Sequence, residues 1–311
     1  MNIHISIVQT TYKRWPESKR SLDAIFEQVG LPAREILVVN DDPSSGLPEW
    51  LLSRAAANRG IFRVIHRSSN GGLAQARNDA LQNARGKFIT FCDDDDEWEP
   101  HTLLRLLQPF QDSSAHFSVG LGTKTALNRG LVDMGVYSLR TLFERGVTPP
   151  VSCQVFQTSI LRVVNGFGTH IESGVDHDLW VRLLDVNPQV MVRAGVQSHA
   201  ITDMAATRMT SSPKREQLIA RSIQVWRPTL VAHFGPSYAK SFSRSYSNHL
   251  RLRRLHLLAH GRDPIVNLRL ILRLRGLPGF LRFLVRRYLN RGTGFDAFAD
   301  VGATSGPKPA P

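Results

Sequence analysis

Two hydrophobic patterns alternate along the first 110 residues of the chain. Runs of β-branched and aromatic residues without Gly or Pro are typical of buried strands, and apolar residues three and four apart are typical of helices. The strand pattern occupies residues 4–10, 35–39, 62–65 and 87–92, and the helical pattern occupies 17–29, 73–84 and 99–110. Because the two patterns alternate at short spacing, we expect an α/β fold with a mainly parallel sheet and helices on both faces.

Polar clusters directly follow three of these predicted strands. They are residues 10–12 (Thr-Thr-Tyr), 40–42 (Asn-Asp-Asp) and 93–96 (four Asp). Ligands of open parallel sheets bind beyond the carboxyl ends of the strands. We therefore expect the three clusters to converge on one pocket.

The four successive aspartates require compensation, because neighbouring carboxylates repel one another at an interior strand end. In an extended segment alternate side chains share a face, so Asp93 and Asp95 are expected to point one way and Asp94 the other. One face would then offer hard oxygen ligands suited to Mg²⁺ or Mn²⁺. The alternative is a solvated acidic turn, with Asp96 or Glu97 capping the helix predicted over 99–110.

A second acidic segment lies about eighty residues further on. Residues 175–183 fit the opening of a helix, with Leu179 and Leu183 in its apolar stripe. Asp176 and Asp178 fall in its first turn, where capping alone would explain them.

The net charge of +13 is concentrated in the last third of the chain. Residues 1–213 carry a net charge of −1, and residues 214–311 carry +14. A near-neutral body with a basic appendage indicates a catalytic or binding domain joined to an element that meets an anionic surface. We divide the chain into a body over 1–213, a basic helical region over 214–301 and a disordered tail over 302–311.

The basic region reads as helices from Gln217 onward, and arginines lie among aliphatic residues between 265 and 289. Helices of this kind suit the surface of an anionic membrane. The alternative is that they pack on the body or on a second copy of the chain, forming a homodimer. No uncharged run reaches the roughly 18 residues of a membrane-spanning helix, and no secretory signal is evident. We expect a cytoplasmic protein, attached peripherally to the inner face of the cell membrane if the basic helices bind lipid.

Cysteine is rare in the chain. Cys92 and Cys153 are too few for a disulfide framework or a cysteine zinc site, and both lie in apolar surroundings. We expect both to be buried and reduced.

Taken in order, the motifs over residues 3–212 resemble glycosyltransferase family 2. They are the strand ending in residues 10–14, Val-Val-Asn-Asp over 38–41, Asn-Gly-Gly over 70–72, Ala-Arg-Asn over 76–78, Gly86, the aspartates 93–96 and Asp-His-Asp-Leu-Trp over 176–180. The resemblance implies a GT-A fold: a Rossmann-like, mostly parallel sheet flanked by helices, here followed by the basic α-helical C-terminal region. Residues 1–213 would be the catalytic domain.

The resemblance also implies how a nucleotide sugar is held. Thr10, Tyr12 and Asp41 would bind its base, most often uracil, with the Tyr12 ring stacked on the base and Asp41 accepting the imide N–H. Asn40 stands where many relatives carry Asp. Arg77 would reach a phosphate or clamp Asp41; an exposed helix arginine in an ion pair is the alternative.

The same resemblance assigns the acidic strand end. Asp94 would meet the ribose, while Asp95, with Asp93 near it, would ligate the Mn²⁺ or Mg²⁺ that bridges the diphosphate. His199 and Arg208 lie in a later connection that closes over the diphosphate in some related enzymes.

In the second acidic segment, the resemblance makes Asp176 the catalytic base and Asp178 the second acidic position, with Val175 where the family has Glu. A base is needed because the acceptor hydroxyl must lose its proton as it attacks the anomeric carbon. Trp180 would line the acceptor pocket or, as the alternative, belong to the core.

The sequence therefore predicts a metal-dependent, inverting glycosyltransferase that moves a sugar from a nucleoside diphosphate, most often UDP, to an acceptor hydroxyl. The acceptor would be a glycan, a lipid-linked sugar or a cell-surface polysaccharide. A nucleotidyltransferase is the first alternative, although residues 10–14 lack the glycine-rich loop that it needs. A nucleic-acid-binding protein is the second, although the basic residues alternate with aliphatic rather than stacking aromatic ones.

Overall fold

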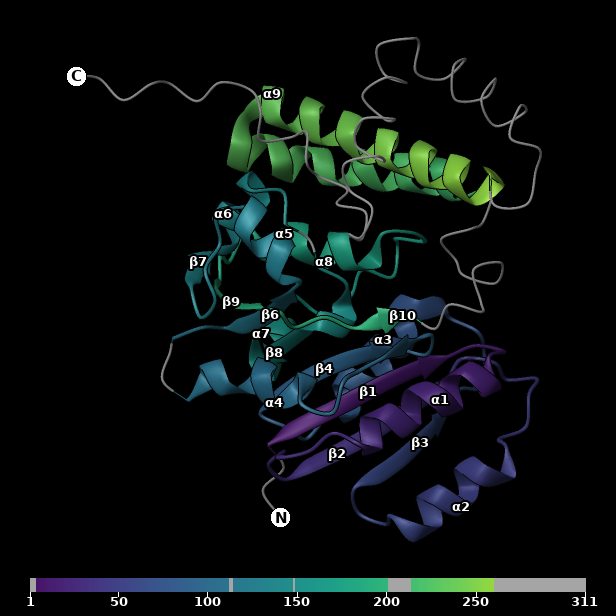
Figure 1. The fold of residues 1–311 in the computed structure, drawn as a ribbon. Helices are drawn as coiled ribbons and strands as arrows, with labels where there is room; N and C mark the ends of the chain where they lie inside the picture. Colours follow the sequence, from purple (N-terminus) through teal and green to yellow (C-terminus); the bar gives the residue numbers. More distant parts are fainter. Residues whose placement is uncertain (1–3, 112–113, 148, 201–213, 260–311) are drawn as a thin grey trace.

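A computed structural model describes residues 4–111, 114–147, 149–200 and 214–259, and its centre is one eight-stranded sheet (Figure 1). The strand order is β3-β2-β1-β4-β8-β6-β9-β7. The strands are β1 (Ile5–Thr11), β2 (Arg34–Asn40), β3 (Phe62–His66), β4 (Phe88–Asp93), β6 (Phe117–Leu121), β7 (Val136–Ser138), β8 (Gln154–Gln157) and β9 (Gln189–Ala194). β1 to β4 are mutually parallel, β6 is parallel to β9, and β7 and β8 run antiparallel to their neighbours. The mostly parallel α/β sheet predicted from the sequence is confirmed.

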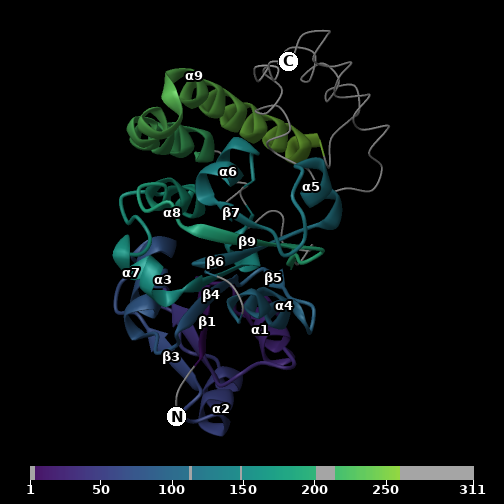
Figure 2. The ribbon, with the colours of Figure 1, turned by 90° about the vertical axis from the view of Figure 1, so that its left-hand side faces the viewer.

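Helices cover the sheet and extend above one part of it. They are α1 (Trp15–Phe26), α2 (Glu49–Ala57), α3 (Gly72–Asn83), α4 (Thr102–Leu107), α5 (Thr123–Asn128), α6 (Leu139–Glu144), α7 (Thr158–Val163), α8 (Val175–Leu183) and α9 (Arg215–Ala259). α8 lies between the sheet and the long α9 in both views (Figures 1 and 2). α9 is kinked at Gly235, which has a φ of 83° and is followed by Pro236.

The period-two alternation of the strands produces a core on each face of the sheet. In β1, Ile5 and Ile7 belong to the core that includes Leu22 of α1, whereas Val8 belongs to the core that includes Ala80 of α3. All five side chains are fully buried. Both faces are therefore covered, which is why these strands read as continuous apolar runs.

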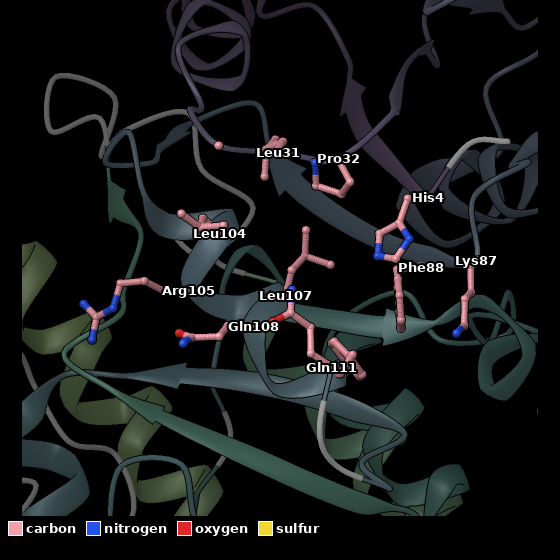
Figure 3. Close-up of a pocket in the computed structure, with 12 residues that line it drawn as sticks. His4, Leu31, Pro32, Lys87, Phe88, Leu104, Arg105, Leu107, Gln108 and Gln111 are labelled. Atoms are coloured by element: carbon pink, nitrogen blue, oxygen red, sulfur yellow. The ribbon is translucent and has the colours of Figure 1, made fainter. Parts of the chain in front are cut away.

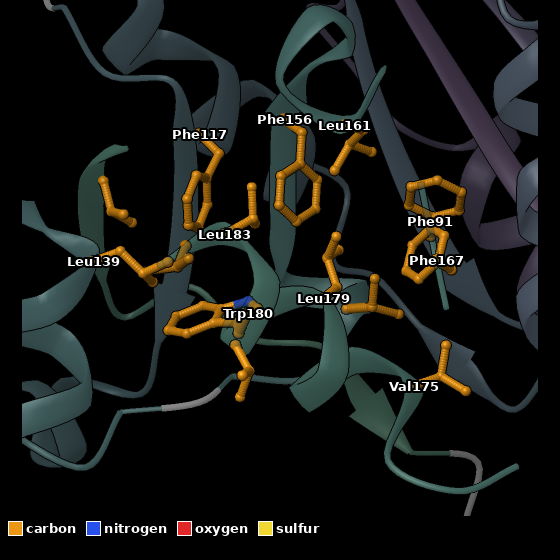
Figure 4. Packing of buried hydrophobic residues seen from close by; sticks show 14 of the residues in the cluster. Phe91, Phe117, Leu139, Phe156, Leu161, Phe167, Val175, Leu179, Trp180 and Leu183 are labelled. Atoms are coloured by element: carbon orange, nitrogen blue, oxygen red, sulfur yellow. The ribbon is translucent and has the colours of Figure 1, made fainter. Parts of the chain in front are cut away.

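The larger core continues beneath α8 and α9. Figure 4 shows Phe117 of β6, Phe156 of β8 and Trp180 of α8 converging within it. The ring centroids of Phe117 lie 5.0 Å from Phe156 and 5.7 Å from Trp180. This aromatic packing fixes α8 against the second half of the sheet.

The helix predicted over 99–110 begins later than the sequence indicated. α4 starts at Thr102 and passes into a 3₁₀ turn over Gln108–Phe110. The preceding residues 96 and 97 form a short strand, β5, paired with β10 (His199–Ala200). The expectation that Asp96 or Glu97 caps the helix is wrong, because pairing with a segment a hundred residues away holds them in extended backbone.

Both cysteines are buried and unpaired, as the sequence predicted. The predicted basic helices between 265 and 289 and the tail over 302–311 lie outside the described residues. Within the described ranges, no helix is long and apolar enough to cross a membrane.

Candidate active site

The carboxyl ends of β1, β2 and β4 lie side by side. Thr10 is the register partner of Asp93, and Thr11 is the partner of Asn40. The backbone N–H of Asp41 donates to the Thr11 carbonyl at 2.9 Å. The structure thus brings together the three polar clusters that the sequence predicted to converge.

A single buried arginine joins this edge to α8. Arg77 of α3 is 1% exposed, and its guanidinium donates to Asp93 Oδ1 at 2.7 Å and to Asp176 Oδ1 at 2.5 Å. Its charge also lies 5.1 Å from the ring centroid of Phe167. Burial alone lowers the pKa of Arg77, but the two carboxylates outweigh it, so its pKa lies above the ordinary value. Two carboxylates that lie 83 residues apart in the chain therefore share one cation.

This placement contradicts two of the three roles that we considered for Arg77 and leaves contact with a phosphate as a prediction. The side chain is neither an exposed surface ion pair nor the clamp of Asp41. Arg67, which follows β3, makes the ion pair with Asp41 and donates from Nε to Asp79 of α3 at 2.7 Å. Sequence reasoning missed Arg67, although its position two residues after a predicted parallel strand was a usable signal.

Asp41 is fixed by the start of α3. Its Oδ1 and Oδ2 accept the backbone N–H groups of Gly71 at 3.0 Å and Gly72 at 2.8 Å. Gly72 has a φ of +79°, a conformation that residues with a side chain rarely adopt. The two glycines therefore place a carboxylate, held in one orientation, beside the edge where the base of a nucleotide is predicted to bind.

The other predicted base-binding residues divide into a buried and an exposed group. Asn40 is fully buried, accepts the Asp42 N–H at 3.1 Å and contacts His66 Nδ1 at 3.0 Å, so it shapes the turn beneath the site. Thr10 is 8% exposed at the end of β1. Tyr12 is 43% exposed, and its ring is open to stacking, with Lys13 Nζ 5.1 Å from the centroid.

Two arginines form ion pairs with the aspartates at the end of β4. Arg77 holds Asp93, and Arg14 forms ion pairs with Asp94 and, at 3.2 Å, with Asp95. Asp94 is 1% exposed, and burial raises its pKa to about 7 even though the charge of Arg14 opposes that rise. Sequence reasoning missed Arg14, which follows the polar cluster at the end of β1 by two residues.

The oxygen donors at this edge fit a hard divalent cation in their chemistry. Within the described residues, however, no three acidic, His or Cys side chains are gathered around one point. Asp95, with Asp93 near it, would therefore supply part of the coordination, and the phosphates of a bound nucleotide and water would supply the rest. Such binding requires Asp95 to exchange its contact with Arg14 for the metal.

Of the acidic residues of α8, Asp176 is the one that faces this edge. Asp178 is 1% exposed and accepts hydrogen bonds from Arg182 Nε at 2.8 Å and Trp226 Nε1 at 3.0 Å. It anchors α9 to α8 and does not join the site. Trp180 donates from Nε1 to Gln154 Oε1 at 2.8 Å inside the core, so its position favours the core alternative over the acceptor pocket (Figure 4).

The remaining predicted residues lie in the connection after β9. His199 belongs to β10, whose pairing with β5 puts its backbone opposite Glu97, next to the acidic strand end. Arg208 lies outside the described residues.

A cavity of about 600 Å³ lies near the amino ends of β1 and β4, away from their carboxyl ends (Figure 3). It is lined by His4 before β1, Lys87 before β4 and Arg105 of α4. Burial, together with the charge of Lys87, lowers the pKa of His4. Arg105 donates to the backbone carbonyls of residues 194 and 195 at 2.8 and 2.9 Å. None of the predicted site residues lines this cavity, so it is separate from the candidate active site.

Comparison with known proteins agrees with this architecture. Residues 6–137 match the family described as "Glycosyl transferase family 2". A relative from Escherichia coli K12, named "Putative colanic acid biosynthesis glycosyl transferase WcaA", is 26% identical over 220 residues, covering 68% of this chain and 77% of its own.

Solved structures share the fold at low sequence identity. Staphylococcus aureus TarS, in complex with UDP-GlcNAc, superposes with a TM-score of 0.61 at 17% identity, covering 81% of this chain and 73% of TarS. The mannosyltransferase PcManGT from Pyrobaculum calidifontis, in complex with GDP-Man and Mn²⁺, gives 0.60 at 16% identity, covering 93% and 81%.

Together, the fold and these matches define the chain as a glycosyltransferase with a GT-A fold, as the sequence predicted. The match to glycosyltransferase family 2 covers residues 6–137, which is less than half of the chain. Neither the nucleotidyltransferase nor the nucleic-acid-binding alternative is favoured by the matches.

Proposed function

We propose that the protein transfers a sugar from a nucleoside diphosphate sugar, with UDP as the expected nucleotide, to a hydroxyl of a growing polysaccharide, and inverts the anomeric configuration. The observation that carries the proposal is the Asp93–Arg77–Asp176 bridge. Through one shared guanidinium, this bridge connects the acidic strand end, where the diphosphate is expected, with the carboxylate that is expected to act as base. A role in polysaccharide synthesis is supported by the name of the Escherichia coli relative.

The proposed reaction is a single displacement. Asp176 accepts the proton of the acceptor hydroxyl, the acceptor oxygen forms a bond to the anomeric carbon, and the bond from that carbon to the diphosphate oxygen breaks. The nucleoside diphosphate leaves with the electron pair. About 30% of the Asp176 side chain is exposed, so an acceptor hydroxyl can reach its carboxylate.

The nucleotide would be held by groups that already have fixed positions. Tyr12 would stack on the base, Asp41 would accept its imide N–H, and Asp94 would meet the ribose. Mn²⁺ or Mg²⁺, bound by Asp95 with Asp93 near it, would neutralise the departing diphosphate. The Mn²⁺ named with PcManGT supports this choice of metal.

Nucleotide release tests the proposal directly. The full-length protein is incubated with Mn²⁺ and, in turn, UDP-, GDP- and dTDP-sugars, and free nucleoside diphosphate is measured with and without EDTA. We expect binding of one nucleotide class and slow hydrolytic release of that nucleotide, and we expect EDTA to abolish the release. Absence of both binding and release with every donor would refute the proposed function, and EDTA-resistant release would refute the metal dependence alone.

A further inference from the structure

Arg14 connects the end of β1 with the acidic end of β4. Its guanidinium forms an ion pair with Asp94 through Nη2 and donates from Nη1 to Asp95 Oδ2 at 3.2 Å. The Asp94 side chain is 1% exposed and the Asp95 side chain is 14% exposed, so water and salt screen these charges only in part. A side-chain cation therefore lies on the carboxylate that is predicted to ligate the metal.

The backbone holds Arg14 in this place. Arg14 directly precedes α1, and its carbonyl accepts the backbone N–H of Ser18 at 2.9 Å. Lys13 has a φ of +59°, in the left-handed region that residues with a side chain rarely adopt. Strained backbone of this kind persists where the surrounding structure over-determines it, and it is common at functional sites. Because a main-chain hydrogen bond fixes the start of α1, we expect this turn to keep its shape when the Arg14 side chain is replaced.

The two arginines of the acidic strand end differ in how freely they can move. Arg77 is 1% exposed, and two carboxylates hold it. The Arg14 side chain is 23% exposed, and its contact with Asp95 is the longer of its two ion pairs. A divalent cation that takes Asp95 from Arg14 can therefore leave the pair between Arg14 and Asp94 intact.

A metal ion on Asp95 would then lie beside a positive charge. Arg14, retained by Asp94, repels a divalent cation on the neighbouring carboxylate, and the repulsion is stronger where screening is incomplete. A nucleoside diphosphate brings negative charge of its own, and its phosphate oxygens are ligands for the metal. The bound diphosphate would therefore compensate the charge of both cations.

We propose that Arg14 competes with the divalent cation for Asp95, so that the metal binds tightly only together with the nucleotide. The proposal rests on the proposed function, because it takes Asp95 as a ligand of the metal. Arg14 is then a positioning residue, which acts on the reaction through Asp95. By linkage, the metal and the nucleotide raise each other's affinity by the same factor, so Arg14 makes metal binding depend on the arrival of the donor.

Binding of Mn²⁺ to the full-length protein tests the proposal without any turnover. Free Mn²⁺ is measured by electron paramagnetic resonance while the protein is titrated, first with the metal alone and then with UDP, GDP or dTDP added in turn. We expect the nucleotide that binds to tighten Mn²⁺ binding by the wild type at least about tenfold. Arg14→Gln should bind Mn²⁺ alone at least about tenfold more tightly than the wild type does, and the nucleotide should tighten that binding less.

Three further variants assign the effect. Arg20→Gln removes another arginine of α1, which pairs with Glu97 and has a side chain 53% exposed, and it should behave as the wild type. Arg14→Lys keeps the charge and should stay closer to the wild type than to Arg14→Gln. Adding Asp95→Asn to Arg14→Gln should abolish the gained affinity, which locates the metal on Asp95. The melting temperature of each variant is recorded alongside.

Any of four results would overturn the proposal. Equally tight Mn²⁺ binding by the wild type with and without bound nucleotide would show that the two ligands are not coupled, and this comparison needs no variant. Equal Mn²⁺ affinity of Arg14→Gln and the wild type would show that Arg14 does not compete with the metal. A gain as large in Arg20→Gln would reduce the effect to overall charge, and a gain as large in Arg14→Lys would show that the charge of Arg14 is not its cause. Failure of the proposed function looks different, because no nucleoside diphosphate would then bind to the wild type or to any variant.

Discussion

Replacing Arg77 with Gln should destabilise the protein, because Asp93 and Asp176 share its guanidinium. Breaking a fully buried ion pair costs about 3–5 kcal/mol. Here the arginine is 1% exposed but the two carboxylate side chains are 32% and 30% exposed, so water compensates part of the loss. We expect a loss of about 2–3 kcal/mol in the free energy of unfolding. For a protein of this size, that corresponds to a fall of about 5–10 °C in melting temperature.

Urea unfolding and thermal melts of full-length variants measure this effect. Arg140→Gln is the matched control, because Arg140 pairs with Glu144 on an exposed helix surface, with both side chains 48% exposed. Such pairs contribute about 0–1 kcal/mol. The control should therefore melt close to the wild type.

A double variant separates the charge effect from the loss of packing. Once Arg77 is replaced, Asp93 and Asp176 repel each other, so adding Asp176→Asn should restore about 1 kcal/mol of the lost stability. If Arg77→Gln has the same melting temperature as the wild type and the Arg140→Gln control, the bridge contributes nothing to stability and the reasoning is refuted. If the double variant is as unstable as the sum of the two single variants, the lost stability comes from packing.

Three further predictions concern single side chains. Asp176→Asn should lower turnover by at least about 10²-fold and leave nucleotide affinity unchanged, and full activity of this variant would show that Asp176 is not the base. Asp178→Asn, two residues away, should instead lower the melting temperature, because it loosens the attachment of α9. Asp95→Asn should weaken nucleotide binding in Mn²⁺ but not in EDTA, as measured by titration, and an equal loss in both would place Asp95 outside the metal site. Because burial raises the pKa of the Cys153 thiol to about 11 and that of Cys92 well above its usual range, iodoacetamide at pH 8 should label neither in the native protein and both in urea; native labelling would contradict their burial.

The strands of the first half were predictable because their apolar residues are local and regular. The ends of β1 to β4 differ from the predicted strands by at most one residue. The convergence of the polar clusters also followed from topology alone, since parallel strands end at one edge. The start of α4 did not follow, because a partner strand a hundred residues away holds residues 96 and 97.

The ion-pair partners of the arginines could not be predicted from local sequence patterns. Arg77 meets Asp176 across 99 residues of sequence, through a side-chain contact between α3 and α8. One distinction was accessible, because residues two apart on a helix point about 200° away from each other. Asp176 and Asp178 could therefore never have shared one site, and helical geometry alone would have assigned them opposite faces.

The division of α8 limits how this segment can vary in sequence. Asp176 faces the sheet edge, Asp178 fastens α9, and Trp180 fills the core, all within about one turn of helix. Inserting or deleting one residue inside Val175–Leu183 would rotate everything beyond it by about 100° and misplace several of these contacts together. Length changes among homologues should therefore fall outside Val175–Leu183, in stretches such as residues 168–173, where no helix imposes a register.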